Sequence, residues 1–213
     1  MNIDFKKILV LAPHIDDEVA CAGVVYRFVE ERKDVVVAVF SFAEKSMPNG
    51  FDKDVGHYEF EKSISLLGID PFSSVYRYNY EVRCFPEYRQ QILENLVSLQ
   101  KDVDPDLVLL PTHFDIHQDH QTICREGVRA FSKTGASILG YEWPHNTMGF
   151  KHTTYIHIED RHLRRKFDCM HCYKSQQHRS YISTDYIKSI ATIYGVQAGV
   201  KYAEAFETIK LRI

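Results

Sequence analysis

The amino-acid sequence predicts an α/β fold: a single Rossmann-like, doubly wound domain with a mostly parallel sheet and helices on both faces. Residues 8–12 and 35–40 are apolar runs typical of buried strands, the second rich in β-branched residues, and a helical pattern lies between them. This strand–helix–strand order indicates a parallel pair with a right-handed crossover. Clusters of His and Asp directly follow the apolar runs at residues 8–12 and 107–111. Open α/β sheets bind their ligands at this edge.

Length and composition narrow the class of protein. The chain has 213 residues, 45% of them hydrophobic, which suffices for one well-buried core and is short for two. We therefore expect one domain over residues 1–213. The net charge is -3 and basic residues are scattered apart from residues 164–166, so nucleic-acid binding is not indicated. No stretch is long enough for a membrane span or a signal-peptide core, and we expect a cytoplasmic protein with a small-molecule substrate.

The five cysteines are expected to be reduced thiols, because the count is odd and no secretory signal precedes them. Cys169 and Cys172 match C-x-x-C, which raises a redox or zinc alternative. They lie in a helical pattern, however, with no strand before it and no second pair to complete a zinc site. We expect them to be buried structural residues.

The first third of the chain alternates regularly between strand and helix patterns. Acidic residues followed by apolar residues at helical spacing predict a helix over about residues 16–32. Residues 41–53, after the second strand, are expected to form a loop at the ligand-binding edge. A further helix is predicted over about residues 54–67, ending at Gly68 in the C-cap position.

The middle of the chain continues this alternation. Residues 74–80 are predicted to form a strand, and residues 86–101 a helix with one apolar face. The apolar run at residues 107–111 predicts a buried strand that ends in a turn. A helix is then predicted over about residues 119–132.

The last third of the chain is predicted to form a further series of strands and helices. Strands are expected at residues 137–141 and about 153–158, followed by a helix over about residues 160–173. More helix is expected around residues 186–193, and a last strand near residues 206–211.

The two polar clusters carry the chemistry. His14 and Asp17 are three residues apart at a helix start, so both side chains can converge on one metal ion. One histidine from the cluster at residues 113–120 would complete a His/Asp/His set with an open coordination position, as in hydrolytic zinc sites. Asp16 is then free to act as general base toward the attacking water. A further, protonated histidine could stabilise an oxyanion or protonate a leaving amine.

The same clusters resemble two motifs of the LmbE/PIG-L-like zinc-dependent N-deacetylases. Residues 13–18, Pro-His-Ile-Asp-Asp-Glu, resemble the A-H-P-D-D-E motif, and residues 117–120, His-Gln-Asp-His, resemble the H-P-D-H motif. Weaker similarities lie at residues 41–44, 67–68 and 175–176, so the resemblance covers essentially the whole chain. The sequence departs from the family pattern at three positions that supply no ligand: Ile15, Ala43 and Gln118.

Residue by residue, the resemblance implies a site with one Zn²⁺ per chain. His14, Asp17 and His120 would bind the zinc, Asp16 would act as base, and His117 would be the electrostatic or acid partner. The implied activity is removal of an N-acyl group, with N-acetyl expected, from an amino sugar or amino-sugar conjugate.

Structural roles compete with functional ones for several residues. Acidic residues at a helix start are often only caps, and the joint occurrence of both clusters favours catalysis here. Glu44 is a candidate substrate contact or a loop anchor. Trp143, the only tryptophan, could stack on a sugar or pack in the core. His113 and Asp115 are expected to support the site or to order the loop rather than bind the metal.

Two other functions are considered beside the N-deacetylase. A metal-dependent phosphoesterase also uses Asp and His clusters, although two-metal sites usually need more bridging carboxylates. A non-catalytic α/β ligand-binding domain would have no use for Asp16 beside the metal. The arginine that many family members place in the third segment is not evident at residues 55–59, which leaves the substrate open. The oligomeric state is also open, and a homo-oligomer is one option.

Overall fold

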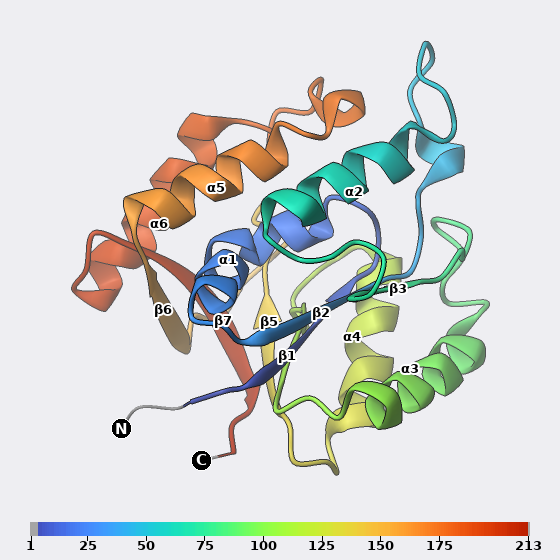
Figure 1. Cartoon of the computed structure of the whole chain (residues 1–213), viewed down its shortest axis with the longest axis horizontal. Coiled ribbons are helices and arrows are strands. Elements are labelled where there is room, and N and C mark those ends of the chain that lie inside the picture. The colour runs from blue at the N-terminus through green and yellow to red at the C-terminus, as the bar shows by residue number, and fades with distance from the viewer. Residues whose placement is uncertain (1–3, 213) are drawn as a thin grey trace.

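A single mixed sheet forms the centre of the protein and confirms the α/β class (Figure 1). The structure is a computed structural model and describes residues 4–212. The strand order is β3-β2-β1-β4-β5-β7-β6. Strands β1 to β5 pair in parallel, and β7 runs antiparallel to both of its neighbours. The strands are β1 (Lys7–Ala12), β2 (Asp34–Val39), β3 (Val75–Arg77), β4 (Leu107–Pro111), β5 (Ser137–Tyr141), β6 (Thr154–Ile158) and β7 (Tyr202–Lys210).

Helices cover both faces of the sheet, as predicted. Figure 1 shows α1, α2 and α5 on one face and α3 and α4 on the other, while α6 packs against β7. The helices are α1 (Ala22–Glu30), α2 (Val55–Leu66), α3 (Arg89–Val103), α4 (Gln118–Phe131), α5 (Asp160–Met170) and α6 (Thr184–Ala198), with short 3₁₀ helices η1 (Asp17–Cys21), η2 (Glu44–Ser46) and η3 (Lys174–Gln176). Within residues 4–212, none of the helices has the length and apolarity that a bilayer crossing requires.

Strand β1 shows why the central strands are continuous apolar runs. Ile8 and Val10 pack in the core under α1 and α2, whereas Leu9 and Leu11 pack in the core under α3 and α4. All four side chains are completely buried. A strand covered on both faces has no solvent-facing side, so its sequence does not alternate between polar and apolar residues.

The helix predicted over residues 16–32 is divided in the structure. It begins as the 3₁₀ helix η1 and becomes an α-helix only at Ala22. The reason lies far along the chain, because the carboxylate of Glu204 in β7 accepts hydrogen bonds from the backbone N–H groups of Gly23 (3.2 Å) and Val24 (2.8 Å). These are free donors at the start of α1, where a negative charge is also favourable. Glu204 therefore caps α1.

The cap is completed by a buried ion pair. The ammonium group of Lys166 in α5 lies 2.6 Å from a carboxylate oxygen of Glu204 and also donates to the carbonyl oxygen of Ala20 at 2.6 Å. Both charged side chains are buried. Lys166 and Glu204 thus join α5, β7 and the start of α1, directly behind the polar loop that follows β1.

Removal of the Lys166 charge is expected to destabilise the fold. Lys166→Met keeps most of the side-chain volume but leaves the Glu204 carboxylate buried without its cation, and breaking a buried pair in this way costs about 3–5 kcal/mol. Urea denaturation should show a decrease of this size in the free energy of unfolding. Lys62→Met, at an exposed lysine of α2, is the control and should change it by less than about 0.5 kcal/mol. Equal stabilities for the two variants would refute the role of the pair.

The sheet order determines where a ligand site can form. Strand β1 lies between β2 and β4. After β1 the chain adds β2 and then β3 on one side of β1, and it adds β4 on the opposite side. The connections after β1 and β4 therefore diverge and leave a crevice at the carboxyl ends of these strands. This is the switch point at which doubly wound sheets bind ligands.

Candidate active site

A cavity of about 540 Å³ opens at the carboxyl ends of β1 and β4. It is lined by all but one of the candidate site residues: His14, Asp16, Asp17, His117, His120 and Trp143. Glu44 lies outside this lining, where its Oε1 is 3.8 Å from Nε2 of His57. A substrate contact at Glu44 stays a prediction.

The loop after β1 brings His14 and Asp17 to the same side. The backbone N–H of His14 donates to Oδ2 of Asp17 at 2.8 Å, and the intervening Asp16 has a left-handed backbone with φ of 76°. Asp and Asn adopt this conformation more readily than most non-glycine residues. A tight turn followed by a 3₁₀ helix therefore directs the side chains of His14 and Asp17, three residues apart, toward the same point.

Three side-chain atoms meet at this point. Nδ1 of His14 and Nε2 of His120 lie 3.3 Å and 3.2 Å from Oδ2 of Asp17, and the two nitrogens are 3.3 Å apart. Each of the three residues is less than 10% exposed. His14 and Asp17 come from the loop after β1, and His120 comes from the first turn of α4. The two sequence clusters thus converge as expected.

The spacing of these atoms fits a tetrahedral zinc ion. Ligand atoms about 2.0–2.1 Å from such an ion lie about 3.3–3.4 Å from one another, and nitrogen and carboxylate oxygen are typical zinc ligands. The three measured separations are close to that edge length. A second donor set is also present, because ligand nitrogens of His14, His117 and His120 lie within 4.8 Å of one another. The set with Asp17 is the more compact and supplies a negative charge.

Each histidine of the set formed by His14, Asp17 and His120 is also hydrogen-bonded, through its other ring nitrogen, to a second carboxylate. Nε2 of His14 is 2.8 Å from Oδ2 of Asp119, and Nδ1 of His120 is 2.8 Å from Oδ2 of Asp115. The carboxylates fix which nitrogen carries the proton and leave the opposite nitrogen free to bind a metal. Asp115 therefore supports the site, as the sequence predicted.

The electrostatics of this cluster favour positive charge. Burial alone would lower the pKa of His120, but the nearby carboxylates of Asp17 and Asp115 raise it to about 10. Burial also opposes the raised pKa of His14, which hydrogen bonds to Asp119 and Asp17 produce. Asp17 shows the converse, because His120 and His14 outweigh burial and hold the pKa of its carboxyl well below the usual range. The carboxylates thus create a strong site for a cation.

Asp16 lies beside the cluster in a different environment. Its side chain is half-buried, and burial together with the negative charges of Asp17 and Glu18 raises its pKa well above the usual range. Opposing contributions come from the positive charges of Arg179 and His120. A carboxyl with these neighbours, open to the cavity, is suited to accept a proton.

Glu18, the last acidic residue of the first cluster, does not line the cavity. Its Oε1 accepts hydrogen bonds from Ser63 Oγ at 2.6 Å and from the Tyr173 hydroxyl at 2.5 Å. Burial raises the pKa of Glu18 to about 7. This carboxyl therefore links η1 to α2 and to the segment after α5.

His117 caps α4 and faces the same cavity. Its Nδ1 accepts a hydrogen bond from the backbone N–H of Asp119 at 3.2 Å, so Nε2 carries the proton. Burial and the neighbouring His120 and His14 lower its pKa to about 4. At neutral pH the free protein therefore presents His117 as a neutral N–H donor, which suits the electrostatic one of its two predicted roles, electrostatic or acid partner.

Several contributors to the site are not evident from sequence patterns. The role of Asp119 is one of them, although its place in the second cluster is consistent with an orienting partner for the histidine of the first. Arg179 and Tyr181 line the cavity from the segment before α6, without any recognisable motif. Ser175 lies in a segment whose similarity to the family was evident, but its contact was not: it donates its N–H and Oγ–H to the carboxylate of Glu59 at 2.8 Å and 2.6 Å, which attaches η3 to α2.

Comparison with known proteins identifies the family to which the chain belongs. A family model described as PIG-L: GlcNAc-PI de-N-acetylase matches residues 9–131, a range that contains both polar clusters. Diacetylchitobiose deacetylase from Thermococcus kodakarensis is 23% identical over 232 residues, which cover 97% of this chain and 84% of that protein.

Solved structures share the fold. N,N'-diacetylchitobiose deacetylase from Pyrococcus horikoshii superposes with a TM-score of 0.79 at 20% identity, covering 97% of this chain and 85% of that one. The 4-carboxy-2-hydroxymuconate hydratase from Pseudomonas putida gives 0.78 at 19% identity, covering 98% of each chain. Because a hydratase shares the fold with a deacetylase, the fold alone does not specify the reaction.

Proposed function

We propose that this chain, which belongs to the PIG-L (GlcNAc-PI de-N-acetylase) family, is a zinc-dependent hydrolase that removes an N-acetyl group from an amino sugar or its conjugate. The observation that carries the proposal is the compact triangle of donor atoms from His14, Asp17 and His120, with sides of 3.2–3.3 Å. Three protein ligands with a fourth position open are typical of catalytic rather than structural zinc. Relatives named as diacetylchitobiose deacetylases support an amino-sugar substrate.

The residues around the donor atoms of His14, Asp17 and His120 have different roles in the proposed amide hydrolysis. When bound, the ion would polarise the amide carbonyl and make the attacking water more acidic. Asp16 takes the proton as the water oxygen forms its bond to the carbonyl carbon. The Nε2–H of His117 is the donor available to the oxygen that becomes negative. When the C–N bond breaks, the proton held by Asp16 passes to the leaving amine, which regenerates the carboxylate.

The cavity around the reacting groups can hold more than the acetamide. At about 540 Å³ it has the size of a small-molecule site. Three basic residues line it together with polar groups from the loops: Lys45, Arg83 and Arg179. These features suit a polar, sugar-sized substrate and leave its exact identity open.

The reaction itself is tested by its products. Incubation with N,N'-diacetylchitobiose should release acetate and a primary amine in equal amounts, and both should cease when zinc is removed with a chelator and return when it is restored. Release of inorganic phosphate from phosphate esters without release of acetate would favour the phosphoesterase. A protein that releases neither but binds N-acetylated sugars would be the ligand-binding domain.

A further inference from the structure

We propose that Trp143 is a positioning residue: its indole N–H holds the carboxylate of Asp17 in the orientation that faces the two histidines. The inference rests on the proposed metal site and concerns how that site is kept in shape. Nε1 of Trp143 donates to Oδ1 of Asp17 at 2.9 Å. The indole is 3% exposed, so this contact is made in the interior.

The two oxygens of Asp17 have separate partners. Oδ2 lies against Nδ1 of His14 and Nε2 of His120, and it also accepts the backbone N–H of His14. Oδ1 accepts the indole N–H, and Asp17 as a whole is 3% exposed. Without the indole, Oδ1 would be a buried charged atom that has lost its donor, and the carboxylate would turn to find another. The indole N–H therefore determines which oxygen faces the metal position.

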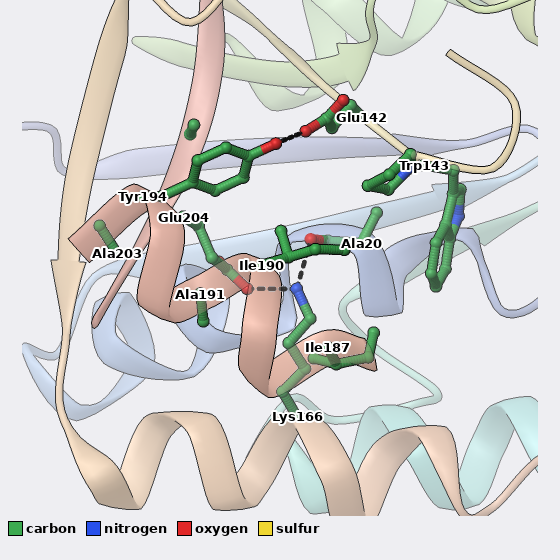
Figure 2. A pocket seen from close by; sticks show the side chains of 12 residues that line it. Ala20, Glu142, Trp143, Lys166, Ile187, Ile190, Ala191, Tyr194, Ala203 and Glu204 are labelled. Atoms are coloured by element: carbon green, nitrogen blue, oxygen red, sulfur yellow. Dashed lines mark hydrogen bonds and ion pairs between the residues drawn. The ribbon is translucent and has the colours of Figure 1, made fainter. Parts of the chain in front are cut away.

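The chain on either side of Trp143 is fixed by contacts with α6 and with the segment that precedes it. The preceding residue, Glu142, is hydrogen-bonded to the hydroxyl of Tyr194 in α6, as Figure 2 shows. Two residues later, the ring of His145 stacks on Tyr181 with centroids 3.7 Å apart and planes inclined by 3°. Trp143 also lies 5.7 Å from Tyr181 between ring centroids. These contacts keep the N–H donor in place before any metal arrives.

Trp143 also separates two cavities. One of its sides lines the candidate active site, and it borders a second cavity of about 30 Å³ between β7, α5 and α6 (Figure 2). The second cavity is lined in part by the paired side chains of Lys166 and Glu204 and has room for one or two water molecules. A small residue at position 143 would join the cavities and admit water. The informative variant is therefore Trp143→Phe, which retains a large ring and removes only the donor.

Metal affinity is the first measurement. Loss of a partner that orients a metal ligand typically weakens binding about 10–100-fold, so Trp143→Phe should raise the zinc dissociation constant by this factor in competition with a chromophoric chelator. Tyr141→Phe is the matched control, because Tyr141 is equally buried and donates to the backbone carbonyl of Leu11 at 2.8 Å rather than to Asp17. It should leave the constant within about twofold. Equal constants for wild type and a folded Trp143→Phe would refute the proposal.

The wild-type protein provides a second test that needs no variant. Trp143 is the only tryptophan, so a ¹H–¹⁵N spectrum contains one indole N–H signal. Zinc titration should shift this signal and saturate at about one equivalent, and the N–H should exchange slowly with solvent. An indole signal that zinc does not move would overturn the inference even if Trp143→Phe fails to fold. Absence of zinc binding by the wild type would instead refute the proposed function.

Discussion

Asp16→Asn should lower kcat for deacetylation by about 10²–10⁴-fold, the usual contribution of a positioned general base, while zinc content stays near that of the wild type. Asparagine has nearly the shape of aspartate but cannot take the proton from water. It also accepts the left-handed backbone with φ of 76°, so the turn that aims His14 and Asp17 should survive. Zinc content and turnover measured on the same preparation separate a catalytic defect from a folding defect.

Asp16→Ala is the informative companion to this variant. Alanine lacks a polar group to support the left-handed conformation and is disfavoured there. Any loss of metal seen with alanine but not with asparagine would therefore reflect the turn rather than the proton. Two results would contradict the assignment: loss of zinc in Asp16→Asn, which would make Asp16 a ligand, and unchanged kcat, which would make a base unnecessary.

Asp17→Ala should reduce the zinc content from about one equivalent per chain to near zero, with activity lost in parallel. The carboxylate supplies the only negative charge of the donor triangle, and its Oδ2 lies 3.2–3.3 Å from both imidazole nitrogens. The loss of affinity should exceed the roughly 100-fold expected from removing an orienting partner. Elemental analysis after dialysis against metal-containing buffer is the measurement.

Two histidine variants complete the experiment. His117→Ala should keep its zinc and lose activity, because His117 is placed to donate to substrate. His113→Ala should change neither, since His113 is exposed and lies beside Glu207, with Nδ1 3.2 Å from a carboxylate oxygen. If His117→Ala loses the metal while Asp17→Ala retains it, the wider donor set with three histidines is the correct one.

Local patterns were sufficient to predict most of the fold. The strand predicted at residues 137–141 is confirmed at both ends, and the helix predicted over residues 54–67 is present as Val55–Leu66, with Gly68 at φ 78° beyond it. These elements are defined by their own apolar spacing and by turn residues at their ends. The convergence of the two polar clusters could also be predicted from local patterns, because each cluster comes directly after a parallel strand.

Features that depend on distant contacts could not be predicted in this way. Strand β7 begins at Tyr202, earlier than the predicted residue 206, because its first half pairs with β6 across a stretch that includes the polar Glu204. Likewise, the bond between His14 and Asp119 joins residues 105 positions apart, and side-chain pairings of that kind leave no periodic signal. Helix α6 is different: it spans Thr184–Ala198, beyond the predicted residues 186–193, and its capping residues Ser183 and Gly199 are local signals that could have extended the prediction.

The cap on α1 also constrains the order in which the elements of the chain can fold. The backbone N–H groups of Gly23 and Val24 donate their hydrogen bonds to a carboxylate about 180 positions later in the sequence. Contacts of such long sequence separation form late, since the entropy of closing the loop opposes them. Strands β1 to β5 can therefore pair first, while the start of α1, which follows the loop that carries His14 and Asp17, is completed only when β7 joins the sheet. The loop that carries His14 and Asp17 is therefore expected to reach its final shape only after β7 has docked.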